Sequence, residues 1–276
     1  MHSSNQQPPF ELGGIQQTMF LPLWGRFMES QKSDPLLYDA KAIEIINQLD
    51  YDFSTLGEKL GEYNAISWVV RAKTMDMVVE NFIQKHPNGT IVNIGAGLDT
   101  TFERIDNGKI MWYDLDLPDS IAFRKKFISE TNRRKYISKS VFDYSWFNDI
   151  TPIQDNVLFL AAGVLMFFEV EELRQLFCQL SSEFPNGEFF FDTLSREGLK
   201  YANDMMRNAG MKEHLLSWGV DSANEIAKWD NKIKVIDEFP YYKHTPRKTS
   251  WNPTIISTMD LCDENKGANF YHIKFI

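Results

Sequence analysis

The feature that most constrains the fold is a short apolar run that ends in a glycine-rich turn, Ile91-Val92-Asn93-Ile94-Gly95-Ala96-Gly97-Leu98-Asp99-Thr100. The apolar residues are typical of a buried strand, and the polar residues after the turn are typical of a helix start. Such a strand–turn–helix junction lets a ligand lie against bare backbone, with helix N–H groups facing it. The stretch therefore predicts a nucleotide-type site at the end of a strand.

Two acidic signals follow this turn. Met111-Trp112-Tyr113 runs into Asp114 and Asp116 about 20 residues later, at the distance where an acid on a second strand can accept ribose hydroxyls. A third strand, predicted at 135–141, leads to Asp143-Tyr144, where a carboxylate can accept from an adenine amino group. The order of turn, ribose acid and adenine-side acid predicts an adenosyl cofactor.

The turn also discriminates between cofactors. Gly95 and Gly97 begin the dinucleotide pattern G-x-G-x-x-G, but Thr100 stands where the third glycine belongs. That glycine permits close packing of helix and strand over a pyrophosphate. Its absence disfavours a nicotinamide oxidoreductase and favours S-adenosylmethionine, which has no pyrophosphate.

The surrounding pattern alternates between strands and helices. Apolar runs predict strands near 90–94, 109–113, 135–141, 157–161 and 188–191, and two more at 232–239 and 269–275. Helical spacing predicts a helix at 65–84, another beginning at Asp34-Pro35, and helices over 195–230. Pro118-Asp119 begins a further helix, on which we expect Arg124, Lys125 and Lys126 to form a solvated face. The prediction is an α/β fold with a mostly parallel, seven-stranded sheet.

We expect one domain made of four consecutive parts. An N-terminal helical cap covers about 10–88, the cofactor-binding core 89–194, a helical lid 195–230, and the last strands 231–276.

Composition narrows the class of protein. The net charge of −9 argues against a nucleic-acid surface, and no apolar run is long enough to span a membrane. Two cysteines, five scattered histidines and a polar N-terminus predict no disulfide framework, no metal site and no signal peptide. We therefore expect a cytoplasmic protein that binds neither nucleic acid nor membrane, whose oligomeric state the sequence leaves open.

The stretch 92–100 together with Asp114-Leu115-Asp116-Leu117-Pro118 resembles the leucine carboxyl methyltransferase family, which includes bacterial O-methyltransferases of polyketide-type molecules. The resemblance covers about residues 65 to 193. It implies a class I methyltransferase (Rossmann-like) fold, S-adenosyl-L-methionine as methyl donor, S-adenosyl-L-homocysteine as product, and methylation of an oxygen.

The resemblance also implies roles for single residues. Arg71 resembles the arginine that binds the cofactor carboxylate, Gly95 the backbone contact, Asp116 the ribose acid, and Asp143-Tyr144 the adenine-side pair. An arginine on an apolar helical face also indicates an anion nearby, with a salt bridge to Asp76 or another acid as the alternative. Neighbouring residues complete the expected cofactor site: Asn93, Ala96, Gly97, Asp99, Thr100, Asp114, Leu117, Ala161, Ala162 and Gly163.

The acceptor side is less defined. We expect Val164, Phe167, Phe168 and Arg196 to line the substrate pocket. Ala162 and Phe167 stand where the eukaryotic carboxyl methyltransferases carry Glu and Tyr.

Asp192, Tyr201 and His214 are candidate bases, but no residue is assigned to catalysis. The leading prediction is an O-methyltransferase acting on a small-molecule hydroxyl or carboxylate. A protein C-terminal carboxyl methyltransferase and an inactive S-adenosylmethionine-binding protein are the alternatives.

Overall fold

The computed structural model describes residues 16–49, 51, 53–150, 156–208 and 215–276. Its centre is a seven-stranded sheet with the order β3-β2-β1-β4-β5-β7-β6. Strand β7 runs antiparallel to all the other strands of the sheet. The strands are β1 (Thr90–Ile94), β2 (Met111–Asp116), β3 (Arg134–Ser138), β4 (Val157–Ala161), β5 (Glu188–Leu194), β6 (Ile233–Pro240) and β7 (Ala268–Phe275). The predicted α/β fold with a mostly parallel sheet is confirmed.

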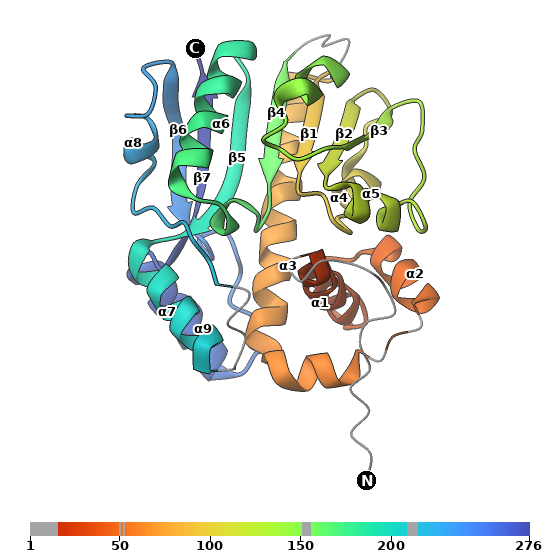
Figure 1. Ribbon diagram of the computed structural model, residues 1–276. Coiled ribbons are helices and arrows are strands. Elements are labelled where there is room, and N and C mark those ends of the chain that lie inside the picture. The colour runs from red at the N-terminus through yellow and green to blue at the C-terminus, as the bar shows by residue number, and fades with distance from the viewer. Residues whose placement is uncertain (1–15, 50, 52, 151–155, 209–214) are drawn as a thin grey trace.

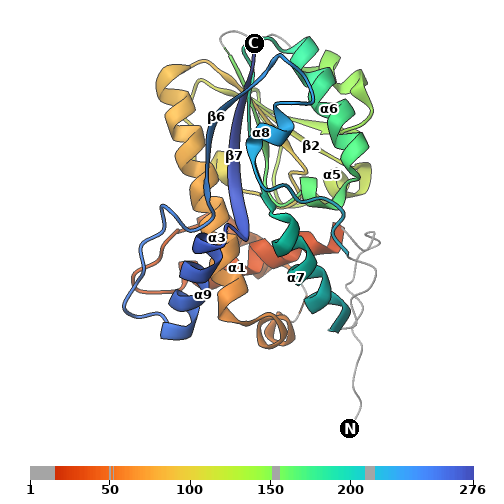
Figure 2. The same cartoon turned by 90° about the vertical axis from the view of Figure 1, so that its left-hand side faces the viewer.

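Helices cover both faces of this sheet (Figures 1 and 2). The longer helices are α1 (Phe20–Ser30), α2 (Ala40–Gln48), α3 (Ser54–Lys85), α5 (Pro118–Arg124), α6 (Val170–Glu183), α7 (Arg196–Asn208) and α9 (Pro253–Glu264). The shorter ones are η1 (Gln16–Met19), α4 (Thr101–Ile105), η2 (Tyr144–Asp149), η3 (Leu165–Phe167) and α8 (Ala223–Ile226). Helices α1, α2, α7 and α9 gather below the edge where the parallel strands end (Figure 1).

The alternation of side chains along β1 and β4 divides the core in two. Val92 and Phe159 point to the face covered by α6, whereas Ile91 and Leu158 point to the face covered by α3. All five residues of each strand are buried, which explains their continuous apolar runs. The core thus holds the carboxyl ends of five parallel strands at one edge.

Two predicted helices differ from the structure. The helix expected from Asp34-Pro35 begins only at Ala40, because Asp39 accepts a hydrogen bond from the Ala42 N–H and caps it. Residues 215–222 contain no helix, although their apolar residues suggested one. There the Asn203 side chain bonds both the N–H and the carbonyl of Leu216, at 2.8 Å each, in place of helical partners.

Candidate functional site

The glycine turn follows β1 and has a backbone that only glycine adopts easily. Gly95 and Gly97 have φ values of +65° and +44°. A Cβ at Gly95 would lie 2.4 Å from Val164, and one at Gly97 would lie 3.1 Å from Met19. The turn is therefore close-packed between the segment after β4 and the N-terminal segment.

Asp116 ends the neighbouring strand β2 and faces this turn. Its carboxylate accepts from the Gly97 N–H and from the Leu117 N–H, both at 2.7 Å. Burial raises the pKa of Asp116 above its ordinary value, against the lowering effect of these two bonds. The Ser120 side chain also bonds this carboxylate, so only part of its roughly four acceptor positions remains for ligand hydroxyls. The Leu117 side chain lies next to it and is 38% exposed.

On the other side of the turn, Arg71 of α3 lies against the ends of β4 and β5. Its Nη1 is 3.5 Å from Oδ2 of Asp192, whose Oδ1 accepts from the Gly163 N–H at 2.6 Å. Burial raises the pKa of Asp192, although Arg71 and the Gly163 N–H favour its charged form. Arg71 thus pairs with Asp192 and not with Asp76, which instead bonds Arg104 at 2.7 Å.

Arg71 keeps unused hydrogen-bonding capacity. Among the residues that the structure describes, Asp192 is the only group that accepts a bond from it, and that bond is long. A guanidinium has five N–H donors, and 14% of this side chain is exposed. Gly163 has φ +69°, and a Cβ there would lie 2.1 Å from Nη1 of Arg71. The guanidinium therefore lies directly against bare backbone, with donors left for an anion.

The adenine-side pair is more open. Asp143 is exposed and accepts from the Ser145 N–H at 3.2 Å, which caps η2 and lowers its pKa. Tyr144 is partly buried beside Phe147. Strands β3, β2, β1, β4 and β5 lie in this order, so Asp143, Asp116, the glycine turn, Gly163 and Asp192 follow one another along one edge.

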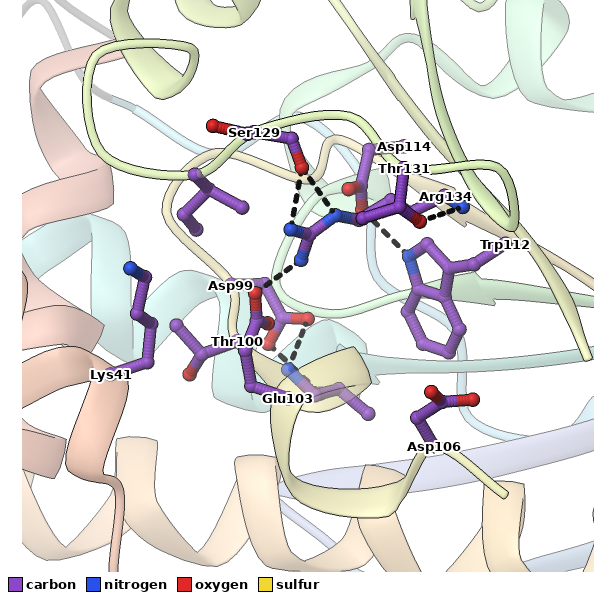
Figure 3. A network of polar contacts seen from close by, with 12 residues as sticks. Lys41, Asp99, Thr100, Glu103, Asp106, Trp112, Asp114, Ser129, Thr131 and Arg134 are labelled. Carbon is purple, nitrogen blue, oxygen red and sulfur yellow. Dashed lines mark hydrogen bonds and ion pairs between the residues drawn. The ribbon is translucent and has the colours of Figure 1, made fainter. Parts of the chain in front are cut away.

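Several residues predicted to bind the cofactor instead have their side chains engaged inside the protein. Asp114 is fully buried, and its carboxylate accepts from the Trp112 indole N–H at 2.8 Å (Figure 3). It also accepts from Arg124 at 2.8 Å. Asn93 donates to Asp114 and to Asp99 at 3.2 Å each. Asp114 suited the ribose pattern by its spacing, but these buried partners occupy its carboxylate.

The same holds for three neutral residues of this region. Thr100 is fully buried and donates to Asp39. Ala96 and Ala161 are 2% and 0% exposed. These three residues can contact a ligand only through their backbone.

On the predicted acceptor side, Val164, Phe167 and Phe168 are partly exposed around η3, and Ala162 of the predicted cofactor site is partly exposed just before them. Arg196 is different, because it is 59% exposed and pairs with Asp221 and Glu225 on the surface. Two carboxylates already neutralise it, so the structure removes the reason for placing it at an acceptor. Tyr201 is 68% exposed on α7, and His214 lies outside the described residues.

Sequence reasoning missed the charged residues that support the turn. Arg124, expected on a solvated face, is 1% exposed and bonds Asp114 together with the carbonyls of Gly97 and Asp99. Arg26 is 3% exposed and bonds the Leu98 carbonyl at 2.8 Å. For Arg26 the available signal was a single arginine among large apolar residues, as at Arg71, whereas Arg124 begins a run of three cations. Close by, Arg134 of β3 bonds the Ser129 carbonyl and pairs with Glu103 (Figure 3).

No helix among the described residues is long and apolar enough to cross a membrane. The described part of the chain also holds no group of three or more His, Cys, Asp or Glu side chains arranged for a metal ion.

The glycine turn, Asp116 and the helices before them lie within the match to a known family. The leucine carboxyl methyltransferase family matches residues 20–181, more than half of the chain. The chain belongs to this family. It is a member of the class of S-adenosylmethionine-dependent methyltransferases, with the class I fold.

Relatives and solved structures agree with this assignment. The chain is 25% identical over 218 residues to the tetracenomycin polyketide synthesis O-methyltransferase TcmP of Streptomyces glaucescens, covering 78% of each. It is also 25% identical over 237 residues to the S-adenosyl-L-methionine-dependent methyltransferase dpfgK of Gibberella zeae, covering 78% of each. A DUF574 family protein from Streptomyces avermitilis has the same fold, with a TM-score of 0.58, 10% identity, and coverage of 92% of this chain and 97% of that one.

Proposed function

We propose that this methyltransferase binds S-adenosylmethionine along the edge formed by Arg71, the glycine turn and Asp116, and transfers its methyl group to an oxygen of a small molecule. The observation that carries the proposal is Arg71, a largely buried guanidinium with one long bond and free donors next to bare backbone at Gly163. A planar guanidinium suits a carboxylate, such as that of the cofactor's amino-acid tail.

The other residues fit the rest of the cofactor. Asp116 has acceptor positions for the ribose hydroxyls, and Leu117 offers an apolar surface beside it. Asp143 and Tyr144 lie one strand further on, where the adenine would follow. Backbone at Gly95 and Gly97 permits close approach, since side chains cannot be accommodated there.

The chemistry supplied by the cofactor is a methyl group on a positively charged sulfur, already activated for displacement by an oxygen in line. The protein has to align the acceptor and exclude water. Val164, Phe167 and Phe168 supply apolar surface for this at the end of β4. Asp192 cannot act as a freely accessible base, because Arg71 and the Gly163 N–H hold both of its oxygens. A carboxylate or an acidic hydroxyl, which needs no strong base, is therefore the acceptor group that suits this site best.

The small-molecule assignment is supported by the name of TcmP, an O-methyltransferase of polyketide synthesis. It is also supported by Ala162 and Phe167, which replace the Glu and Tyr of the eukaryotic carboxyl methyltransferases.

Calorimetric titration with S-adenosylhomocysteine tests the cofactor site. Removing a charge-assisted bond in Arg71→Ala should weaken binding about ten- to a hundredfold. Arg196→Ala, which also removes a paired arginine but on the surface, should bind as wild type does. Equal affinity of wild type and Arg71→Ala would refute the placement of the cofactor.

Transfer of a labelled methyl group tests the acceptor. Wild type should methylate members of a panel of small phenols and aromatic carboxylates, and alkaline hydrolysis should release methanol from carboxyl products. Transfer only to a peptide with a C-terminal leucine carboxylate would favour the protein substrate. Cofactor binding without transfer to either panel would indicate a binding protein.

A further inference from the structure

Two buried arginines donate hydrogen bonds to three consecutive carbonyl groups of the glycine turn. Arg124 of α5 donates from Nη1 to the carbonyls of Gly97 and Asp99, at 3.0 and 2.7 Å. Arg26 of α1 donates from Nη2 to the carbonyl of Leu98 at 2.8 Å. Because a peptide unit is planar, fixing these three carbonyls also fixes the orientation of the three peptide planes of the turn.

Arg26 is itself held by Asp39, the residue that caps the start of α2. Oδ2 of Asp39 accepts from Arg26 Nε at 2.8 Å, from Arg104 Nη1 at 2.9 Å and from the Thr100 hydroxyl. Its Oδ1 accepts from the Ala42 N–H at 2.8 Å. Asp39 is 0% exposed, and although burial raises its pKa, the two guanidinium groups outweigh this and lower it.

The bonds of Asp39 therefore join four parts of the chain. They link α1 through Arg26, α2 through its own cap, and the turn through Thr100. Arg104 continues the network from α4 to Asp76 on α3, with two bonds of 2.7 Å. Met19, just before α1, packs against Gly97. The N-terminal helices and the turn thus share one buried polar network.

We infer that Asp39 and Arg26 are positioning residues for the cofactor. They fix the backbone of the glycine turn relative to the N-terminal helices, and they couple the packing of these helices to cofactor binding. The inference rests on the proposed function, because it takes this turn as the cofactor site. Coupling is reciprocal: if the helices support binding, binding must stabilise the helices against the turn.

The same helix offers a control for a purely structural role. Glu29 of α1 is 3% exposed and buried as deeply as Arg26, and it accepts from the Leu36 N–H and pairs with Lys32 at 2.8 Å. It has no bond to the turn among the contacts of the described residues. Glu29→Gln should therefore lower stability without changing cofactor affinity.

The test measures the dissociation constant of S-adenosylhomocysteine and the thermal midpoint for each variant. Arg26→Lys keeps the charge but cannot bond Asp39 and Leu98 with a fixed fork, and Asp39→Asn removes the charge that holds Arg26. Both should weaken binding about tenfold or more, while Glu29→Gln stays within twofold of wild type. If Arg26→Lys and Asp39→Asn lower the midpoint as Glu29→Gln does, but bind like wild type, the inference is wrong.

Amide hydrogen exchange on wild type gives a second measurement that needs no variant. Saturating S-adenosylhomocysteine should protect residues 20–30 of α1 as well as 96–101 of the turn. Protection of the turn without α1 would overturn the coupling. The proposed function fails separately, if wild type binds no S-adenosylhomocysteine or if Arg71→Ala binds it equally well.

Discussion

Replacing Asp114 by Asn should destabilise the protein strongly, because Asp114 is the only charge partner that the described residues provide for the buried Arg124. The pair is 0% and 1% exposed, with 2.8 Å between Oδ2 and Nη2. Oδ1 also accepts from the Trp112 indole and from Asn93. In Asp114→Asn the new amide N–H₂ must face either Arg124 or these two donors, so at least one buried donor loses its acceptor.

Breaking a buried ion pair by removing one partner costs about 3 to 5 kcal/mol. Arg124 keeps its bonds to the Gly97 and Asp99 carbonyls, so we expect the lower end, about 3 kcal/mol. For a chain of this size such a loss corresponds to a fall of roughly 6 to 12 °C in the melting temperature. Arg124→Met should cost at least as much, because it also leaves two carbonyls without donors.

Urea unfolding followed by tryptophan fluorescence measures this free energy in the absence of cofactor. The matched control is Asp149→Asn, which removes a surface pair with Lys139 at 2.6 Å and should cost less than about 1 kcal/mol. A loss below 1 kcal/mol in Asp114→Asn would refute the structural role that we assign to Asp114.

Two further changes test the site, and a third tests a buried group of hydroxyls outside it. Gly163→Ala should lower affinity for S-adenosylhomocysteine, because its Cβ would lie 2.1 Å from a guanidinium nitrogen of Arg71. The control is Gly108→Ala, where φ is +78° and the space around the residue is open, so this variant should lose stability but not affinity. Titration of both variants measures the difference. Burial raises the pKa of Asp116, and ligand hydroxyls bond its charged carboxylate. Affinity for S-adenosylhomocysteine should therefore fall as the pH decreases, and the fall should begin above the pH range in which an aspartate usually titrates. Asp116→Asn should bind weakly without this dependence, and an unchanged pH profile would contradict the assignment. Tyr242→Phe should lose about 1 to 2 kcal/mol in urea unfolding, since its buried hydroxyl bonds two other hydroxyls at 2.6 and 2.9 Å, and a loss under about 0.5 kcal/mol would contradict that.

The parts of the site that the sequence predicts well depend on local backbone requirements. Parallel strands covered on both faces are continuous apolar runs, so the strands around 90–94 and 157–161 could be placed almost to the residue. Gly95 and Gly97 occupy backbone conformations that other residues adopt at a cost, and Asp116 ends its strand beside them. Each of these signals lies within a few residues of the position that it predicts.

The charged support of the turn could not be placed in the same way. Arg124 ends a helix whose pattern allowed a solvated face, and its burial depends on Asp114 and on carbonyls 25 and 27 residues away. Arg26 depends on a carbonyl 72 residues away. Burying a charge is costly unless partners are present, and the partners appear only when the chain is folded. A lone arginine in apolar surroundings can indicate buried polar partners, but not which groups they are.

The acceptor side also depends on contacts between residues distant in the sequence, and these contacts are separate from those of the cofactor side in the proposed site. Trp218 and Ser217 donate to the carbonyl of Met166, which places the segment after α7 against η3. Asn203 fixes Leu216 in a non-helical conformation that hydrophobic periodicity cannot reveal. None of these five residues bonds the glycine turn or Asp116 in the described part of the chain. Substitutions of these five residues that change the choice of acceptor should therefore leave the affinity for S-adenosylhomocysteine intact, whereas the Asp39 network should act on cofactor affinity for every acceptor alike.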